Sequence, residues 1–368
     1  MMPCMKKIIQ IEPWIDKSEL KELKKVIKST FVSEHKLNYE FETLIKQITS
    51  SKHAVSMTNG TAATFCALKA LGIGKGDEVI VPNMTFIASA NAVIFAGATP
   101  VLCDVDKNSL CMSAEEASKV ITPKTKAIMP VHLYGKSCDM DSLQELARSH
   151  DLKIIEDAAQ GMGVLYKGKH VGTFGDAGIL SFYANKTITC GEGGVVLSPS
   201  KEVIEDCYKM KNHGRSGKGV FIHETIGFNF CFTEMQAAVG VSQLKKLKKV
   251  IKKKEEIYNF YHKNIDNKFL SKIPVDSHTK PVHWFTSFLT EHKHSFKKHL
   301  NNCGIQTRDF FYPLNKQPCY QNSKLINSSV NLPVSELIYN CGLSLPSSYN
   351  ITKKQLTYIC ERINNFRP

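Results

Sequence analysis

Between Lys52 and Val196, short apolar segments alternate with amphipathic stretches, and this alternation constrains the fold more than any other feature. Seven segments have the length and composition of buried strands: AVSM, EVIVP, TPVLCDV, KAIMPVH, KIIED, AGILSFY and GGVVLS. Helical patterns over residues 62–71, 87–95, 114–120 and 140–150 separate the earlier ones. The alternation predicts a mainly parallel seven-stranded sheet flanked by helices, with ligands bound at the carboxyl ends of its strands.

A long amphipathic stretch from Thr233 to Ile265 follows, and beyond it the pattern changes. HWFTSFLT resembles a strand, FKKHLNNCG a helix that ends at Gly304, and the last residues another amphipathic helix. We therefore predict a large α/β domain over residues 31–265 and a smaller C-terminal α/β domain over 266–368. Residues 1–30, with a helix around 18–29, are expected to join the smaller domain or a partner subunit.

The chain is basic, with 48 Lys and Arg against 34 Asp and Glu and a formal net charge of +14. Seven lysines fall between Lys245 and Lys254 among apolar residues at helical spacing, which predicts one amphipathic helix with a solvated basic face. There is no basic stripe with stacking aromatics and no recognisable nucleic-acid module, so we expect no nucleic-acid partner. The charge suits an anionic small substrate such as a nucleotide sugar.

Targeting and metal signals are missing from the sequence. No apolar stretch reaches the roughly 20 residues of a membrane span, and Met1–Pro13 has no apolar segment of signal-peptide length. We therefore expect a cytoplasmic protein with no membrane contact. The 12 cysteines include no C-x-x-C pair, which argues against a zinc site, so no metal is expected.

Two stretches resemble nucleotide-binding motifs, but both lack a residue that the motif requires. Residues 163–169 fit GxxxxGK, but His170 stands where a P-loop needs a hydroxyl, so this stretch predicts a strand hairpin. The glycines at Gly72, Gly74 and Gly76 do not complete GxGxxG. A P-loop and a dinucleotide fingerprint are therefore both excluded.

Three other features fit one cofactor together. Asn59–Thr61 follow a strand and open a helix, where free N–H groups bind phosphate. Asp157 ends an apolar strand, where a carboxylate needs a partner, and Lys186 follows another strand just before a glycine-rich turn. Separately these residues fit a helix cap, a second cap and a surface lysine. Jointly they are what pyridoxal phosphate (PLP) requires: a phosphate site, a carboxylate at the pyridine nitrogen and a lysine for the Schiff base.

At this point the chain resembles the DegT/DnrJ/EryC1/StrS family of PLP-dependent nucleotide-sugar aminotransferases, whose members have fold type I. The resemblance runs from Trp14 to the C-terminus. The motifs that carry it are NGTAAT, GDEVIVPNMTFIASANAV, GATPVLCDVD, IMPVHLYG, IIEDAAQGMG, GTFGDAGILSFYANKTITCGEGG, NHGR, GFNFCFTEMQAAVGVSQL and GIQTRDFFYP.

The resemblance implies a role for individual residues. Lys186 matches the catalytic lysine that holds PLP, and Asp157 matches the partner of the pyridine nitrogen. The other implied cofactor contacts are the PLP hydroxyl (Gln160), ring stacking (Phe86), the phosphate (Gly60, Thr61, Ser181) and an asparagine from the neighbouring subunit of a homodimer (Asn229). Candidates for substrate contacts are Glu192, His213, Arg308 and Tyr312.

The sequence departs from the family pattern in places. SEHKLNYEFE lacks a glycine that relatives often carry there, which puts substrate contacts from this N-terminal loop in doubt. Ala184 and Cys190 stand where Gly and Thr are usual, and both changes are small. Sugar 3-dehydratases of the family carry His at the lysine position, so Lys186 favours transamination.

The resemblance implies an aminotransferase that takes the amino group from L-glutamate, with pyridoxamine phosphate as the intermediate form of the cofactor. The wording NKTITCGEGG is most similar to GDP-perosamine synthases, which aminate C4 of a 4-keto-6-deoxy sugar. A UDP- or dTDP-4-keto-6-deoxyglucose 4-aminotransferase that makes viosamine, or a 3-keto sugar aminotransferase, stays open. The alternative from another class is a non-catalytic binding protein on the same fold.

Overall fold

The computed structural model describes residues 7–368 except 218, 322, 324 and 329. Its main sheet has the strand order β1-β9-β8-β5-β4-β2-β3. Its strands are β1 (His53–Met57), β2 (Glu78–Pro82), β3 (Thr99–Cys103), β4 (Thr125–Ile128), β5 (Lys153–Asp157), β8 (Ala177–Ser181) and β9 (Gly194–Ser198). Only β9 is antiparallel to its neighbours, β8 and β1, whereas the other neighbouring pairs are parallel. The predicted mainly parallel seven-stranded sheet is confirmed.

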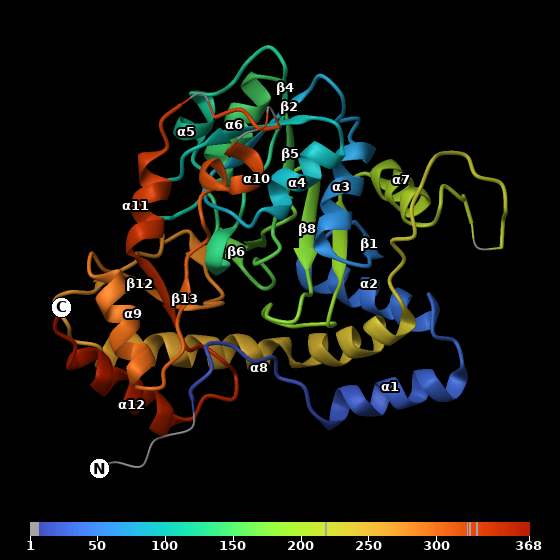
Figure 1. Ribbon diagram of the computed structural model, residues 1–368. Helices are drawn as coiled ribbons and strands as arrows, with labels where there is room; N and C mark the ends of the chain where they lie inside the picture. The colour runs from blue at the N-terminus through green and yellow to red at the C-terminus, as the bar shows by residue number, and fades with distance from the viewer. Residues whose placement is uncertain (1–6, 218, 322, 324, 329) are drawn as a thin grey trace.

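Helices cover both faces of this sheet (Figure 1). Successive residues of a strand point to opposite faces, and accordingly Ile80 packs into one apolar cluster while Val79 and Val81 pack into another. The cluster with Ile80 takes in side chains from α2 (Lys36–Thr49), α5 (Ala114–Ser118), α6 (Met140–Ser149) and α8 (Glu234–Asn264). The other takes in side chains from α3 (Gly60–Ala70), α4 (Ala88–Phe95) and α7 (Lys201–Lys211).

A second sheet lies toward the C-terminal part of the chain. It has the order β10-β12-β14-β13. Its strands are β10 (Ser271–Lys272), β12 (Thr286–Leu289), β13 (Arg308–Asp309) and β14 (Gly342–Leu345). Phe288 of β12 packs with α9 (Lys293–Asn302), α12 (Lys353–Asn364) and the end of α8, so α8 contributes to the cores beneath both sheets. Two further helices, α10 (Pro318–Gln321) and α11 (Pro333–Cys341), lie between β13 and β14 in the chain.

The segment over residues 163–170 is a hairpin, as the sequence predicted. Its strands β6 (Leu165–Tyr166) and β7 (Lys169–His170) pair antiparallel, and β11 (Thr279–Lys280) adds a third strand beside β6. The stretch is therefore not a phosphate-binding loop.

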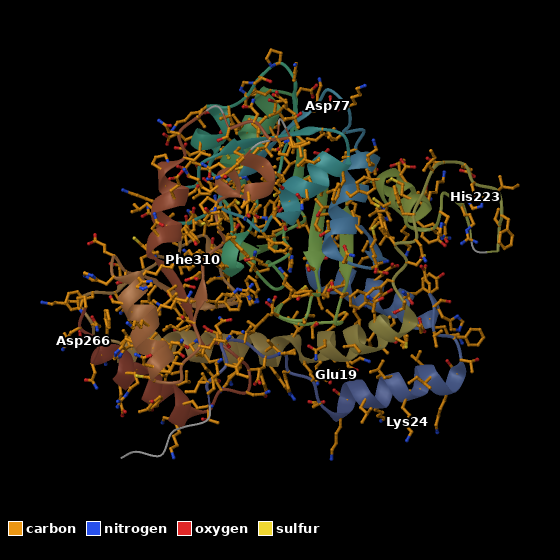
Figure 2. All side chains as sticks on the ribbon, in the orientation of Figure 1. Glu19, Lys24, Asp77, His223, Asp266 and Phe310 are labelled. Atoms are coloured by element: carbon orange, nitrogen blue, oxygen red, sulfur yellow. The ribbon has the colours of Figure 1, made fainter. Side chains whose placement is uncertain are left out.

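The N-terminal segment contacts both parts of the molecule. Ile8 forms a parallel bridge with Ile305, close to the second sheet. Farther along, α1 (Lys17–Ser29) lies along α8 (Figure 1). Glu19 points toward α8, where it pairs with Lys246, whereas Lys24 points away into solvent (Figure 2). The domain boundaries at 31 and 266 stay predictions.

The lysine-rich part of α8 differs from the expected basic face in two respects. The side chain of Lys246 is only 11% exposed, because it pairs with Asp16 and Glu19. Lys245, Lys248, Lys249 and Lys252 are exposed, as predicted. Lys254 is only 3% exposed, because it lies on the buried face of the helix. None of the helices in the described part of the chain is long and apolar enough to span a membrane.

Candidate active site

A cavity of about 830 Å³ opens beside the carboxyl ends of β5 and β8 and the start of α3. Nine residues singled out from the sequence line it: Gly60, Thr61, Phe86, Asp157, Gln160, Ser181, Lys186, Glu192 and Arg308. They come from segments as far apart as residues 60 and 308, and the parallel strands bring them to one edge of the sheet. This is the place where sheets of this kind bind ligands.

Asp157 is the carboxylate of the cavity. It ends β5 and is 9% exposed, so its oxygens need partners inside the protein. Oδ2 accepts a hydrogen bond of 2.6 Å from the hydroxyl of Ser89, and Oδ1 accepts one of 3.1 Å from the N–H of Ala159. Ser89 lies 3.1 Å from the hydroxyl of Thr85, which also lines the cavity. The carboxylate is therefore fixed in orientation on the cavity wall.

The start of α3 forms the end of the cavity that suits an anion. Asn59 caps the helix by accepting the N–H of Ala62, which leaves the N–H groups of the first turn without helical partners. Gly194 of β9 lets this turn approach the sheet, because a Cβ there would lie 2.3 Å from the carbonyl oxygen of Asn59. A Cβ on Gly60 would come within 3.2 Å of the Cβ of Ser181. Two glycines therefore keep this cradle open for a phosphate.

Lys186 supplies the amine of the cavity. Burial lowers the pKa of its ammonium from 10.5 to about 8, while Asp157 acts to raise it and Arg308 to lower it. Its Nζ lies 4.8 Å from the ring centroid of Trp284, another cavity residue. An amine with a pKa of about 8 can both give and take protons near neutral pH.

Gln160 and Phe86 lie on other walls. The Oε1 of Gln160 accepts a hydrogen bond of 2.7 Å from the N–H of Tyr134, which fixes the amide. Tyr134 also receives the N–H of Phe311 on its hydroxyl oxygen, and Phe311 lines the cavity. Phe86 is 53% exposed, and its ring centroid lies 5.9 Å from that of Phe311, so this aromatic side chain is open to a ligand.

Three predicted residues lie outside this cavity. His213 and Asn229 are exposed on the segment after α7, where the N–H of His213 donates to the carbonyl of Phe228. Tyr312 is 41% exposed and makes an edge contact with Tyr339. None of these three side chains lines the cavity.

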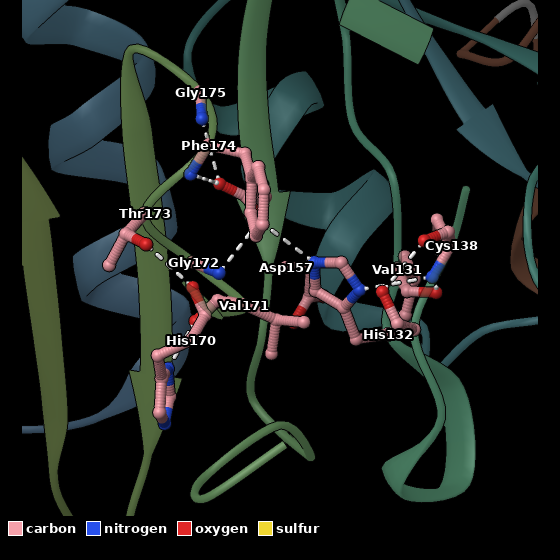
Figure 3. Close-up of polar contacts among 12 residues, drawn as sticks. Val131, His132, Cys138, Asp157, His170, Val171, Gly172, Thr173, Phe174 and Gly175 are labelled. Carbon is pink, nitrogen blue, oxygen red and sulfur yellow. Dashed lines mark hydrogen bonds and ion pairs between the residues drawn. The ribbon is translucent and has the colours of Figure 1, made fainter. Parts of the chain in front are cut away.

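A buried polar network surrounds Glu156, the residue before Asp157, and it was not predicted from the sequence (Figure 3). Glu156 is fully buried, and its carboxylate accepts the N–H groups of Gly172 (2.6 Å), Phe174 (2.6 Å) and Gly175 (2.8 Å). It also lies 3.0 Å from Nε2 of His132. Although burial acts to raise the pKa of Glu156, the hydrogen bonds and His132 outweigh it and the pKa is lowered. An ionised Glu156 therefore fixes the strand end that carries Asp157.

Ser89 and Trp284 were also missed. Ser89 looks like an ordinary residue of a helix start, and only the fold brings it to Asp157. Trp284 had a weak signal, since the chain contains only 2 tryptophans. In the structure, its indole N–H donates to the carbonyl oxygen of Asn185, the neighbour of Lys186.

The arrangement of these groups fits PLP. The start of α3 matches the phosphate, the buried carboxylate of Asp157 matches a protonated pyridine nitrogen, and the amine of Lys186 matches the aldehyde carbon. All three line one cavity, which is within the range that holds a molecule of this size.

Comparison with known proteins agrees with this site. The sequence pattern of the DegT/DnrJ/EryC1/StrS aminotransferase family matches residues 13–364. A curated relative from Escherichia coli O157:H7, named GDP-perosamine synthase, is 40% identical over 98% of this chain and 99% of its own.

Solved structures give the same picture. DesV from S. venezuelae, solved in complex with a ketimine intermediate, superposes with a TM-score of 0.90 at 31% identity. The alignment covers 97% of this chain and 98% of DesV. The PLP form of Spr1654 from Streptococcus pneumoniae superposes with a TM-score of 0.91 at 25% identity, over 97% of this chain and 98% of that one.

Proposed function

The chain belongs to the DegT/DnrJ/EryC1/StrS aminotransferase family and is a PLP-dependent enzyme, and we propose that it aminates a nucleotide-linked keto sugar. The amino donor is L-glutamate, and the acceptor position is C4 of a 4-keto-6-deoxy sugar. The observation that carries this proposal is the meeting of Lys186, Asp157 and the start of α3 in one cavity. A binding protein without catalysis would need neither a lysine of lowered pKa nor a buried carboxylate there.

When bound, PLP supplies an electron sink that stabilises negative charge on the carbon that loses a proton. Asp157 would accept a hydrogen bond from the protonated ring nitrogen and so keep the ring an effective sink. Lys186 moves the proton, since its amine is lowered to a pKa of about 8. The start of α3, with Thr61 and Ser181, would bind the phosphate and so orient the ring, and Phe86 would offer an aromatic side chain to the ring.

The nucleotide proposed is GDP. The choice of GDP is supported by the E. coli relative, which is named GDP-perosamine synthase and matches nearly the whole chain. A sugar nucleotide carries two phosphates, which suits a chain of net charge +14. Glu192 and Arg308 line the cavity and are proposed to contact the sugar. UDP and dTDP sugars are the alternatives.

The active unit is proposed to be a cytoplasmic homodimer whose sites are shared between subunits. Asn229 is exposed and does not line its own cavity, although its neighbours Phe228 and Phe230 do, so its side chain is available to a partner's site. In the sequence, Asn229 comes soon after a loop around His223 that projects from the body of the protein, and we call this loop the arm (Figure 2). The arm exposes Phe221 (81%), Ile222 (73%) and Ile226 (88%), and apolar exposure of this size is typical of an interface.

One assay tests the substrate. The purified PLP enzyme is given L-glutamate and, in turn, the GDP, UDP and dTDP forms of the 4-keto-6-deoxy sugar, and NMR locates the new nitrogen. We expect a 4-amino product, formed fastest with GDP. Nitrogen at C3, or turnover only with a 3-keto sugar, would overturn amination at C4, whereas a preference for UDP or dTDP would overturn GDP alone.

A simpler measurement tests catalysis itself. L-Glutamate without acceptor should shift the visible absorbance of the bound cofactor, because the donor half of the reaction runs alone. Lys186→Ala is the control in which this shift should be lost. A wild-type protein that binds the nucleotide sugar but never changes absorbance with any amino acid would be a binding protein.

A further inference from the structure

Trp284 stands between the catalytic lysine and the second sheet. It lies two residues before β12 and is 1% exposed. Its Nε1–H donates a hydrogen bond of 2.6 Å to the carbonyl oxygen of Asn185, and its ring face lies against the Nζ of Lys186 at 4.8 Å. One side chain therefore contacts both the backbone next to Lys186 and the amine itself.

The loop that carries Lys186 has few other local supports. The N–H of Lys186 donates to the carbonyl of Tyr183 in a single turn. The next backbone hydrogen bond in the loop runs from the N–H of Cys190 to the carbonyl of Phe182, on the far side of the lysine. Within the described residues, two hydrogen bonds tie this stretch to distant segments: the one from Trp284 reaches Asn185, directly beside the lysine, and the N–H of Thr189, three residues beyond it, donates to Oε1 of Gln243 at 3.4 Å.

A buried lysine, Lys254, binds the backbone of Trp284. Lys254 of α8 donates to the carbonyl oxygens of Trp284 (3.0 Å) and Ser347 (2.6 Å). It is 3% exposed and has no carboxylate partner among the described residues. Burying a lysine that binds only carbonyl oxygens is costly, so these two bonds have to be well formed. Trp284 also stacks on Phe285 at 4.0 Å, which restricts its ring.

We propose that Trp284 is a positioning residue for Lys186: its indole N–H fixes the Asn185 carbonyl, and its ring face holds the lysine side chain within the cavity. The inference rests on the proposed role of Lys186 as the PLP lysine. Two effects follow. The amine is confined to the cavity side of the ring, and it is shielded from water, so both its reach and its protonation depend on Trp284.

The test uses Trp284→Phe, which keeps a ring face and loses the N–H. Trp14→Phe is a matched control, because Trp14 is the other tryptophan and also has a lysine, Lys246, 4.7 Å from its ring centroid. The readouts for the PLP-loaded enzymes are the pH midpoint of the visible cofactor absorbance, kcat and KM. We expect Trp284→Phe to move the midpoint by about half a unit and to lower kcat roughly tenfold, with KM for the nucleotide sugar little changed.

Trp284→His, which retains an N–H donor, should recover part of kcat. An unchanged midpoint and kcat in Trp284→Phe, with loss of thermal stability alone, would overturn the inference. That outcome is distinct from failure of the proposed function, in which the wild-type absorbance would not depend on Lys186 at all.

A second measurement applies even where Trp284→Phe does not fold. In Trp14→Phe, the tryptophan emission comes from Trp284 alone, and in the cofactor-free protein it should titrate with the amine of Lys186 near pH 8. Adding Lys186→Met should abolish the titration. Emission that does not titrate, or titrates identically with Met at position 186, would show that the ring and the amine are not in contact.

Discussion

The hydroxyl of Ser89 lies 2.6 Å from Oδ2 of Asp157, so a residue of α4 orients the carboxylate at the end of β5. The two residues are 68 positions apart in the sequence. Ser89 is 1% exposed and donates to an acceptor that faces the ligand cavity. The bond leaves the other lone pairs of the carboxylate available for a ring N–H.

Ser89→Ala should weaken PLP binding without unfolding the protein. A hydrogen bond to a charged group contributes roughly 1.5–3 kcal/mol, so we expect the Kd for PLP to rise about tenfold or more. The measurement is a titration of cofactor-free protein with PLP, followed by absorbance. Ser149→Ala, at the exposed end of α6, is the matched control. An unchanged Kd would mean that Asp157 does not need Ser89.

The amine of Lys186 should deprotonate near pH 8 in the cofactor-free protein. The rate at which trinitrobenzenesulfonate labels this amine, measured by mass spectrometry, should therefore rise with pH and reach half its maximum near pH 8. A free lysine would reach half its maximum at about pH 10.4. Asp157 raises this pKa and Arg308 lowers it, so Asp157→Asn should move the midpoint down and Arg308→Gln should move it up. Shifts in the same direction would contradict this electrostatic account.

Two inactive variants should complement each other if the sites are shared. Lys186→Ala and Asn229→Ala subunits form mixed dimers in which one site keeps both residues. At equal mixing, half of the dimers are mixed, so activity should recover to about a quarter of the wild-type value. Each variant alone, taken through the same exchange, is the control. Subunit exchange proven by mass spectrometry without recovered activity would count against a shared site.

Glu156→Gln should destabilise the protein. The carboxylate accepts three backbone N–H groups, and an amide would place its own N–H₂ against at least one of these donors. We expect a loss of roughly 2–4 kcal/mol in the free energy of unfolding, measured with urea. Glu145→Gln on the exposed side of α6 should change stability by less than about 0.5 kcal/mol. Equal free energies of unfolding for the two variants would show that the hydrogen bonds of Glu156 do not stabilise the protein.

The strands of the main sheet could be predicted because each is a short apolar segment that can be recognised from its own residues. Helix α2 was not predicted, although Leu37, Phe41, Leu44, Ile45 and Ile48 have helical spacing. Part of its first turn is held from far away in the sequence, because the N–H groups of His35, Leu37 and Asn38 all donate to the carboxylate of Glu234. No local pattern contains that partner. The same limit applies to Ser89 and Trp284, whose roles depend on contacts 68 and 99 residues away.

The candidate site shows both outcomes. Lys186, Asp157 and Gly60 were found because each follows or ends a strand, and strand ends meet at one edge of the sheet. Asn229 and His213 lie on an irregular segment, and there the alternation of strands and helices does not predict where a side chain lies relative to the cavity. Their contributions stay predictions that the mixed-dimer experiment addresses.

Helix α8 has a consequence for dissecting the enzyme into parts. Its 31 residues span about 46 Å at 1.5 Å per residue, and Ile257 and Tyr261 near its end pack among side chains of the second sheet and its helices. A fragment cut after Ile265 would expose those side chains, and a fragment that began there would lack part of its core. Exchange of C-terminal halves with relatives therefore needs a junction inside α8 that preserves this packing, so the two parts are not separable modules.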